Sequence, residues 1–318
     1  MVRYVVRRVL ISVGMLAGLS VVIFVVLRAL PGDPVTARLG AAQGFDQAAI
    51  DRLRAAAGLD RPLVTQYFAW ISGMLSGDLG DSYFNRMPVS DLIAARLGPT
   101  LELTVLAVAL SVAVATPAAI AAAIRPGGWA DRLIGALASA GMAFPPFVAG
   151  ILLILAFSVT LHWLPARGFV PLSESVGGNL AGLALPAVSL SVVAAPLVLR
   201  YLRGELITAL ASAYARTAEG KGAPRRVVVV RHALRNAALP SLTMLGLIVG
   251  YTLGGSVIVE YTFGFSGLGA LSVESAFQRD YAVLQSVVLL VSALFIAVSL
   301  AVDLTVWALD PRTRSRRA

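Results

Sequence analysis

The sequence predicts an all-α integral membrane protein with six transmembrane helices and a helical loop outside the membrane after the first of them. Hydrophobic residues make up 58% of the 318 residues, and the mean hydropathy is +0.83. Several uncharged runs of about 20 residues match a hydrocarbon core roughly 30 Å thick. A membrane protein gathers basic residues in cytoplasmic loops, so the net charge of +9 does not indicate a nucleic-acid partner. The absence of cysteine excludes disulfides and cysteine metal sites.

The first apolar run, Val9 to Leu30, follows Arg3, Arg7 and Arg8. It is too long for a signal peptide and ends without a small-residue cleavage site, so we expect a retained first span. Every span should be helical, because backbone groups in hydrocarbon must be satisfied within their own segment. Hydropathy places the six helices at residues 9–30, 100–124, 133–161, 182–202, 237–259 and 283–307.

Proline interrupts several of these spans, namely at Pro117, in "FPPF" (144–147), and at Pro186 and Pro196. Each proline removes a helical hydrogen bond, which favours either a packing kink or a hinge that lines a pore.

Positive charge predicts the orientation. With the N-terminus inside, residues 1–8, 125–132, 203–236 and the C-terminal tail share one side, which, with Arg200 counted in, holds 17 of the 26 basic residues and four acids. Cytoplasmic loops carry such an excess, so both termini are expected in the cytoplasm.

The expected outer loop, residues 31–98, contains two helix patterns. "DQAAIDRLRAAAGL" predicts a helix that ends at Gly58. "DRPLVTQYFAWISGML" predicts a second helix with Asp60 as N-cap and Pro62 in its first turn. Its apolar residues recur at helical spacing: Val64, Tyr67, Phe68, Ile71 and Leu75. This loop is either a docking platform or a lid over the helix ends.

The expected cytoplasmic loop, residues 203–236, has a pattern of its own. A helix is predicted from Glu205 to Lys221, ending at Gly222. "RRVVVVRHALRNAALP" then suits a helix entering the membrane, with its arginines at the wet end. Those arginines could simply enforce topology and bind anionic lipid headgroups. The small residues between 211 and 222 instead favour close approach by another surface.

The loop sequence "YARTAEGKGAPRRVVVVRHALRNAALP" resembles the cytoplasmic coupling loop of the dipeptide/oligopeptide ABC importer permeases, the DppB/OppB family. The resemblance covers the whole chain and keeps the family's order. It includes "RALPGDP", "GLDRPLVTQYFAWISGMLSGDLGDSY", "FPPFVAGILLILAFSVTLHWLPARGF", "GGSVIVEYTFGFSGLGALSVESAFQRDY" and "VDLTVWALDPRTR". One departure is "AEGKG", because an Ala-Arg-Ala-Lys-Gly form is common in the family.

The resemblance implies a type I ABC importer fold whose coupling helix docks on a cytoplasmic ATPase. The domains would be the first span (1–30), the outer loop (31–98), a permease core (99–310) and a basic tail (311–318). Polar contacts would come from Arg216, Thr217, Glu219 and Lys221, with Gly222 as the turn. The full coupling segment would comprise Tyr214, Ala215, Arg216, Thr217, Ala218, Glu219, Gly220, Lys221 and Gly222.

The resemblance also implies partners and a location. The chain would work in the bacterial cytoplasmic membrane, in contact with lipid, with a DppC/OppC-like second permease, two ATPase subunits and an extracytoplasmic binding protein. Alternating access between the two permeases would carry di- or oligopeptides. Nickel complexes, glutathione and haem are the alternative cargoes, and no substrate-contacting residue can be assigned.

Other functional classes fit less well. A phosphate-binding loop is absent, because Gly222 follows Lys221 and Ala215 occupies the first glycine position. ATP and magnesium would therefore bind the partner ATPases, and this chain would have no cofactor. An intramembrane enzyme is disfavoured, because His162 and His232 fall at opposite faces and no Gly-x-Ser-x-Gly motif occurs. We expect neither catalytic residues nor a metal site.

Two transport-related alternatives remain open. An ion-coupled carrier would need ionisable groups within the membrane, for which Asp303 is the clearest candidate. An inert scaffold or receptor subunit would need neither interrupted helices nor a cytoplasmic loop that binds a partner.

Overall fold

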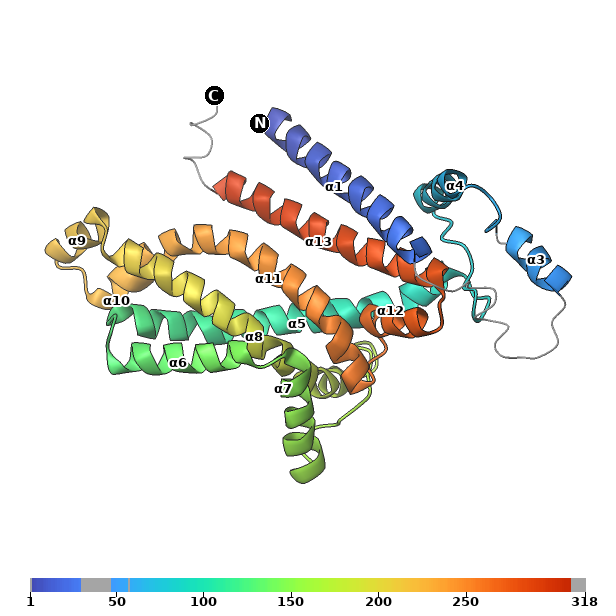
Figure 1. Cartoon of the computed structure of the whole chain (residues 1–318). Helices are drawn as coiled ribbons and strands as arrows, with labels where there is room; N and C mark the ends of the chain where they lie inside the picture. The colour runs from blue at the N-terminus through green and yellow to red at the C-terminus, as the bar shows by residue number, and fades with distance from the viewer. Residues whose placement is uncertain (1, 30–46, 57, 310–318) are drawn as a thin grey trace. The chain divides into compact units, whose positions relative to one another are not determined.

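The computed structural model describes residues 2–29, 47–56 and 58–309 (Figure 1). This part of the chain is helical and has no β-strand, only an isolated bridge between Asp81 and Pro88. Residues 30–46, which include the start of the predicted outer loop (31–98), and residues 310–318, which include the predicted tail (311–318), lie outside the described residues. The all-α prediction is confirmed for the rest.

The chain forms two compact units, which are described separately. Unit 1 comprises Met1–Thr100 and Ser266–Leu294, and unit 2 comprises Leu101–Phe265 and Phe295–Ala318. The helices α5 (Val89–Ile124) and α13 (Tyr281–Leu309) each run from one unit into the other. Unit 1 further contains α1 (Val2–Ala29), α3 (Gln47–Ala56), α4 (Leu63–Ser76) and α12 (Leu268–Phe277).

The helix α4 packs against α1 through aromatic side chains. Phe24 of α1 stacks on Trp70 with ring centroids 6.1 Å apart, and Ser20 Oγ lies 2.9 Å from Tyr67 Oη. The apolar positions predicted for this helix therefore divide between two faces. Tyr67 and Ile71 lie on the packed face, whereas three side chains are exposed: Val64, Phe68 and Leu75.

The C-terminal end of α3 agrees with the sequence prediction, whereas the N-terminal end of α4 does not. Gly58 has a φ of +65°, and the next N–H bonds the Arg54 carbonyl (2.9 Å), so the glycine end of α3 is confirmed. Asp60 as the cap of α4 is wrong. The N-cap residue is Pro62, whose backbone is extended (φ −55°, ψ 142°). The helix α4 therefore begins at Leu63, two residues later than a cap at Asp60 would place it.

A buried carboxylate ties the outer-loop segment to the turn before α13. Asp280 is only 2% exposed and accepts a hydrogen bond from Ser82 Oγ. It also accepts from the backbone N–H groups of Tyr83 (3.2 Å) and Phe84 (3.4 Å). Because the burial of a carboxyl group is compensated when it receives several hydrogen bonds, Asp280 can lie in the interior and fix this loop.

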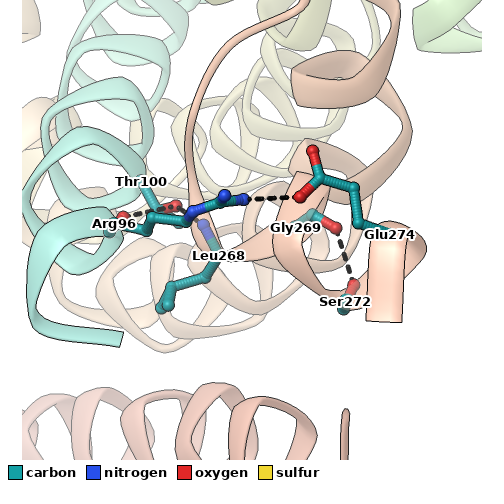
Figure 2. Close-up of polar contacts among 6 residues, drawn as sticks. All are labelled: Arg96, Thr100, Leu268, Gly269, Ser272 and Glu274. Carbon is teal, nitrogen blue, oxygen red and sulfur yellow. Dashed lines mark hydrogen bonds and ion pairs between the residues drawn. The ribbon is translucent and has the colours of Figure 1, made fainter. Parts of the chain in front are cut away.

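A second polar cluster joins α5 to α12, as Figure 2 shows. Arg96 Nη1 donates to Glu274 Oε2 at 2.9 Å, and the Leu268 N–H donates to Thr100 Oγ1 at 2.8 Å. Leu268 is the first residue of α12, so the threonine satisfies an N–H group that the helix itself leaves without a partner. Both contacts hold α12 beside the first turns of α5.

Unit 2 is built around α8 (Val176–Leu210), which contacts α6, α7 and α11. Its other elements are α6 (Trp129–Ala143), α7 (Pro146–Leu153), the π-helix η1 (Ile154–Thr160), α9 (Ala213–Gly220), α10 (Arg225–Val227), the π-helix η2 (Val228–Ala233) and α11 (Leu234–Phe263).

Small residues allow the helices of unit 2 to approach closely. The core around α8 is rich in alanine, including Ala194, Ala195 and Ala209. A methyl group on Gly141 would lie 2.8 Å from the Val192 carbonyl oxygen, so that position of α6 has no room for a side chain. Such contacts favour helix association in lipid, where burial of apolar surface gives little driving force.

Five of the six predicted spans are continuous helices long and apolar enough to cross a membrane: α1, α5, α8, the run Arg225–Phe263, and α13. The predicted helix 133–161 is instead a pair, α6 with α7 and η1, bent by 97°. Phe144 is extended (φ −91°, ψ 124°), because a residue before proline avoids helical backbone. The pair is a sixth span only if both halves are taken together.

Candidate functional site

The helix α9 is a short element between the two long helices α8 and α10–α11 (Figure 1). The single helix predicted from Glu205 to Lys221 is wrong, because α8 ends at Leu210 and Ser212 is extended (φ −72°, ψ 159°). Ser212 Oγ donates to the Ala209 carbonyl (2.6 Å), a local bond that competes with helix continuation. The loop helix is therefore separated from the span by a bend.

The end of α9 is closed by Gly222, whose φ is +83°. The Gly222 N–H bonds the Glu219 carbonyl (2.9 Å), and the Ala223 N–H bonds the Ala218 carbonyl (3.1 Å). These two bonds are the Schellman arrangement, in which a left-handed glycine satisfies the last carbonyls of a helix. The predicted glycine turn is confirmed as backbone geometry.

One residue of α9 is buried against the rest of unit 2. Ala215 is 1% exposed, and α9 contacts α8 and η2. Its methyl side chain permits this close packing, since a larger side chain would hold the helix away. The remaining predicted coupling residues divide by exposure: Ala218 is half-buried, whereas Tyr214, Arg216, Thr217, Glu219, Gly220, Lys221 and Gly222 are exposed.

The side chain of Arg225 links α9 to the end of α5. Its Nη1 donates to Glu219 Oε1 (3.2 Å), and its Nη2 donates to the carbonyl of Ile124 (3.1 Å). Ile124 is the last residue of α5, and a cation is favoured at a helix C-terminus by free carbonyls and the helix dipole. Glu219 is thus engaged within the chain, and the exposed polar groups with the least internal constraint are Arg216 and Lys221.

A stronger ion pair lies in the same unit, between the first turn of α6 and the last turns of α8. Arg203 donates through Nε and Nη2 to the two carboxylate oxygens of Asp131, both at 2.6 Å. The Gly127 N–H also donates to Asp131 (2.8 Å), whose side chain is 9% exposed. Such a two-point pair fixes the angle as well as the distance between helices.

Sequence reasoning did not find the Asp131–Arg203 pair or the Arg225 contact with α5. The partners are separated by 72 and 101 positions, so no periodicity links them. The one available signal is that each charged residue stands at the edge of an apolar run.

The described residues hold no group of three histidine, aspartate or glutamate side chains placed to bind a metal ion. His162 lies just beyond η1 and His232 within η2. Asp303 lies within α13, is half-buried and has an interaction partner.

Comparison with known proteins identifies the chain. Residues 115–315 match the family described as "Binding-protein-dependent transport system inner membrane component", and residues 1–104 match the N-terminal region of such components. The chain belongs to this permease family.

Full-length relatives agree with the assignment. A protein of Brucella ovis named as a peptide permease is 39% identical over 318 residues, covering 99% of each chain. A protein of Sinorhizobium fredii named as a peptide ABC transporter permease is 37% identical, covering 98% of this chain and 99% of its own. The glutathione transport system permease protein GsiC of Escherichia coli K12 is 40% identical over 99% of both chains.

One solved structure, of an amino acid ABC transporter, overlaps 70% of this chain and 94% of its own, with a TM-score of 0.49 and 17% identity.

Membership of the permease family establishes the chain as the transmembrane subunit of an ABC importer. Such permeases generally work with a second permease, ATPase subunits and a substrate-binding protein. The family is one of transport subunits without a known cofactor of their own.

The Asp131–Arg203 pair predicts a stability difference. Arg203→Ala leaves a nearly buried carboxylate with a single N–H donor, which should cost about 2 kcal/mol after allowing for the partial exposure of the arginine. The melting temperature of the purified chain in detergent should fall by about 5 °C.

Arg235→Ala is the control, because Arg235 is exposed on α11 and makes no ion pair with any residue that the structure describes. Equal melting temperatures for the two variants would show that the pair does not hold α6 to α8.

Proposed function

We propose that this permease imports peptides and that α9 is the segment through which the partner ATPases drive it. The observation that carries the coupling assignment is the geometry of α9. It is a short exposed helix between two long apolar helices, held at Ala215 and Arg225 and closed by Gly222. A helix fixed on one face and polar on the other is suited to receive a partner and to transmit its movement.

The docking face would comprise Tyr214, Arg216, Thr217 and Lys221, with the small residues Ala218 and Gly220 allowing close approach. Tyr214 is 42% exposed and offers an aromatic anchor of the kind enriched at interfaces. Glu219 would contribute through its pair with Arg225, which ties the docking helix to α5. Arg216 and Lys221 would contact the partner ATPase most directly, because both side chains are exposed and little constrained within the chain.

Peptide cargo is supported by the names of the relatives. Two relatives with 37–39% identity are named as peptide permeases, and a third, with 40% identity, is a glutathione permease. Glutathione is itself a small peptide derivative, so the shared cargo chemistry is an amide-linked backbone with charged ends. Glutathione is the second candidate cargo, favoured by that third relative.

The orientation proposed is cytoplasmic for both termini and for α9. The excess of basic residues on that side supports it. The segment around α4 would then lie outside the bacterial cytoplasmic membrane, where a binding protein arrives.

Substitution at Gly222 tests the coupling assignment. Gly222→Val places a β-branched residue at φ +83°, with a strain of about 1–2 kcal/mol that is relieved by altering the end of α9. In the reconstituted complex, uptake should fall about tenfold while ATP hydrolysis continues. Ala218→Leu, which adds bulk beside the docking face, should act in the same direction.

Gly204→Ala is the control, because a methyl group at this α8 position meets no atom within 4 Å. Normal uptake and normal substrate-stimulated ATP hydrolysis in Gly222→Val would exclude α9 as the coupling element.

Uptake by proteoliposomes tests the cargo. With the second permease, the ATPases and the binding protein present, labelled dialanine should accumulate only with ATP, and other short peptides should compete. Glutathione accumulation without dialanine accumulation would favour the second candidate. Accumulation of a nickel complex or haem alone would exclude both peptide cargoes.

Single cysteines test the orientation, because the natural chain has none. Ser72→Cys on α4 should react with a membrane-impermeant maleimide in intact cells, and Ala211→Cys should react only after permeabilisation. Both positions are exposed. The reverse pattern would place α9 outside and contradict the proposal.

A further inference from the structure

A cavity of about 350 Å³ lies in unit 1, apart from the coupling helix. It is bordered by the end of α1, by α4, by residues 78–83 and by the first turns of α13. Its volume falls within the range of pockets that bind small molecules. The lining is part apolar and part polar, and its polar side chains include those of Arg28, Arg61, Gln66, Asp81 and Gln285.

Two residues that border the cavity each contain a buried polar atom without a hydrogen-bond partner. Gln66 donates through Nε2 to two backbone carbonyls (2.7 and 3.2 Å), but its Oε1 is buried and unpaired. The indole Nε1 of Trp70 is likewise buried and unpaired. Buried donors and acceptors are nearly always paired in folded proteins, so one unused acceptor and one unused donor beside one cavity call for an explanation.

Other groups in the cavity retain unused polar capacity. Gln285 of α13 is 7% exposed and makes no hydrogen bond through its amide with any residue that the structure describes. Tyr83 also lines the cavity; burial raises the pKa of its phenol despite the opposing effect of the neighbouring Arg28, so the hydroxyl keeps a proton that it can donate.

The lining carries charges of both signs that do not neutralise each other. Arg28 and Arg61 contribute two guanidinium groups, and Asp78 and Asp81 contribute two carboxylates. No ion pair joins either arginine to either aspartate within the described ranges. The carboxylates would repel a simple anion, and the guanidinium groups would repel a simple cation. The lining therefore suits a ligand that bears both charges.

We propose that this cavity binds a short peptide as a zwitterion. The arginines would hold its carboxylate and the aspartates its ammonium group. A peptide unit has one N–H donor and one carbonyl acceptor, for which the Gln285 amide and the Tyr83 hydroxyl in the lining offer partners. The proposal deepens the proposed function and rests on it for the choice of peptides. In the proposed orientation, the site would hold cargo on the outer side of the permease.

Binding of dialanine to the complete complex without its binding protein tests the site. Equilibrium dialysis in nanodiscs measures the affinity for labelled dialanine, and N-acetyl-dialanine and dialanine amide each remove one charged end. We expect both blocked peptides to compete about tenfold less well or worse than unlabelled dialanine.

Variants then assign the contacts. Arg61→Ala and Asp81→Asn change exposed side chains without disturbing the packing between α1 and α4, and each should weaken dialanine binding about tenfold. Arg52→Ala is the control, because Arg52 is exposed on α3, outside the cavity lining, and should leave binding unchanged.

Absence of dialanine binding, or equal affinity for the blocked peptides and the variants, would overturn the proposed site. Proteoliposome uptake separates this result from the proposed function. Import of dialanine without binding at the cavity would remove the site and leave the peptide cargo standing. Binding of dialanine that depends on Arg61 and Asp81, without import of any peptide, would support the site and remove the cargo.

Discussion

The requirement that every backbone polar group be paired inside hydrocarbon determines most of this structure. A chain that is 58% hydrophobic can meet that requirement across a membrane only with long helices. Hydroxyl groups within the helices follow the same rule. Thr252 and Ser286 donate to the carbonyl four residues earlier in their own helices. Ser191 Oγ lies within hydrogen-bond distance of the Ala187 carbonyl of its own helix (2.7 Å) and of the Ala107 carbonyl of α5 (3.0 Å). The same hydroxyl therefore also links two helices.

The same requirement explains where the long helices stop. Isolated prolines such as Pro186 and Pro196 are accommodated within α8. Two consecutive prolines at 145 and 146 separate α6 from α7. The carbonyl of Pro146, in the first turn of α7, accepts from Ser189 Oγ of α8, so a neighbouring helix holds the start of α7 beside the break. Proline spacing therefore decides between a continuous helix and a bent pair.

Local rules made much of this fold predictable from the sequence. Hydropathy located five continuous spans, and the glycines at 58 and 222 marked helix ends, because each of these signals acts within a few residues. The Asp60 cap and the unbroken helix 205–221 failed where a different local interaction prevailed, an extended Pro62 in one case and the Ser212 side chain in the other. The Asp131–Arg203 pair depends on the packing of α6 against α8, which no sequence period encodes.

The two-residue connection between α8 and α9 has a mechanical consequence. Residues 211 and 212, even fully extended, reach about 7 Å, so the joint contains little slack. Contact with η2 and the Arg225 bridge to α5 restrain α9 on its other sides. A force on α9 is therefore transmitted to the ends of three long helices, α5, α8 and α11. The connecting loop is too short to take up the displacement by bending.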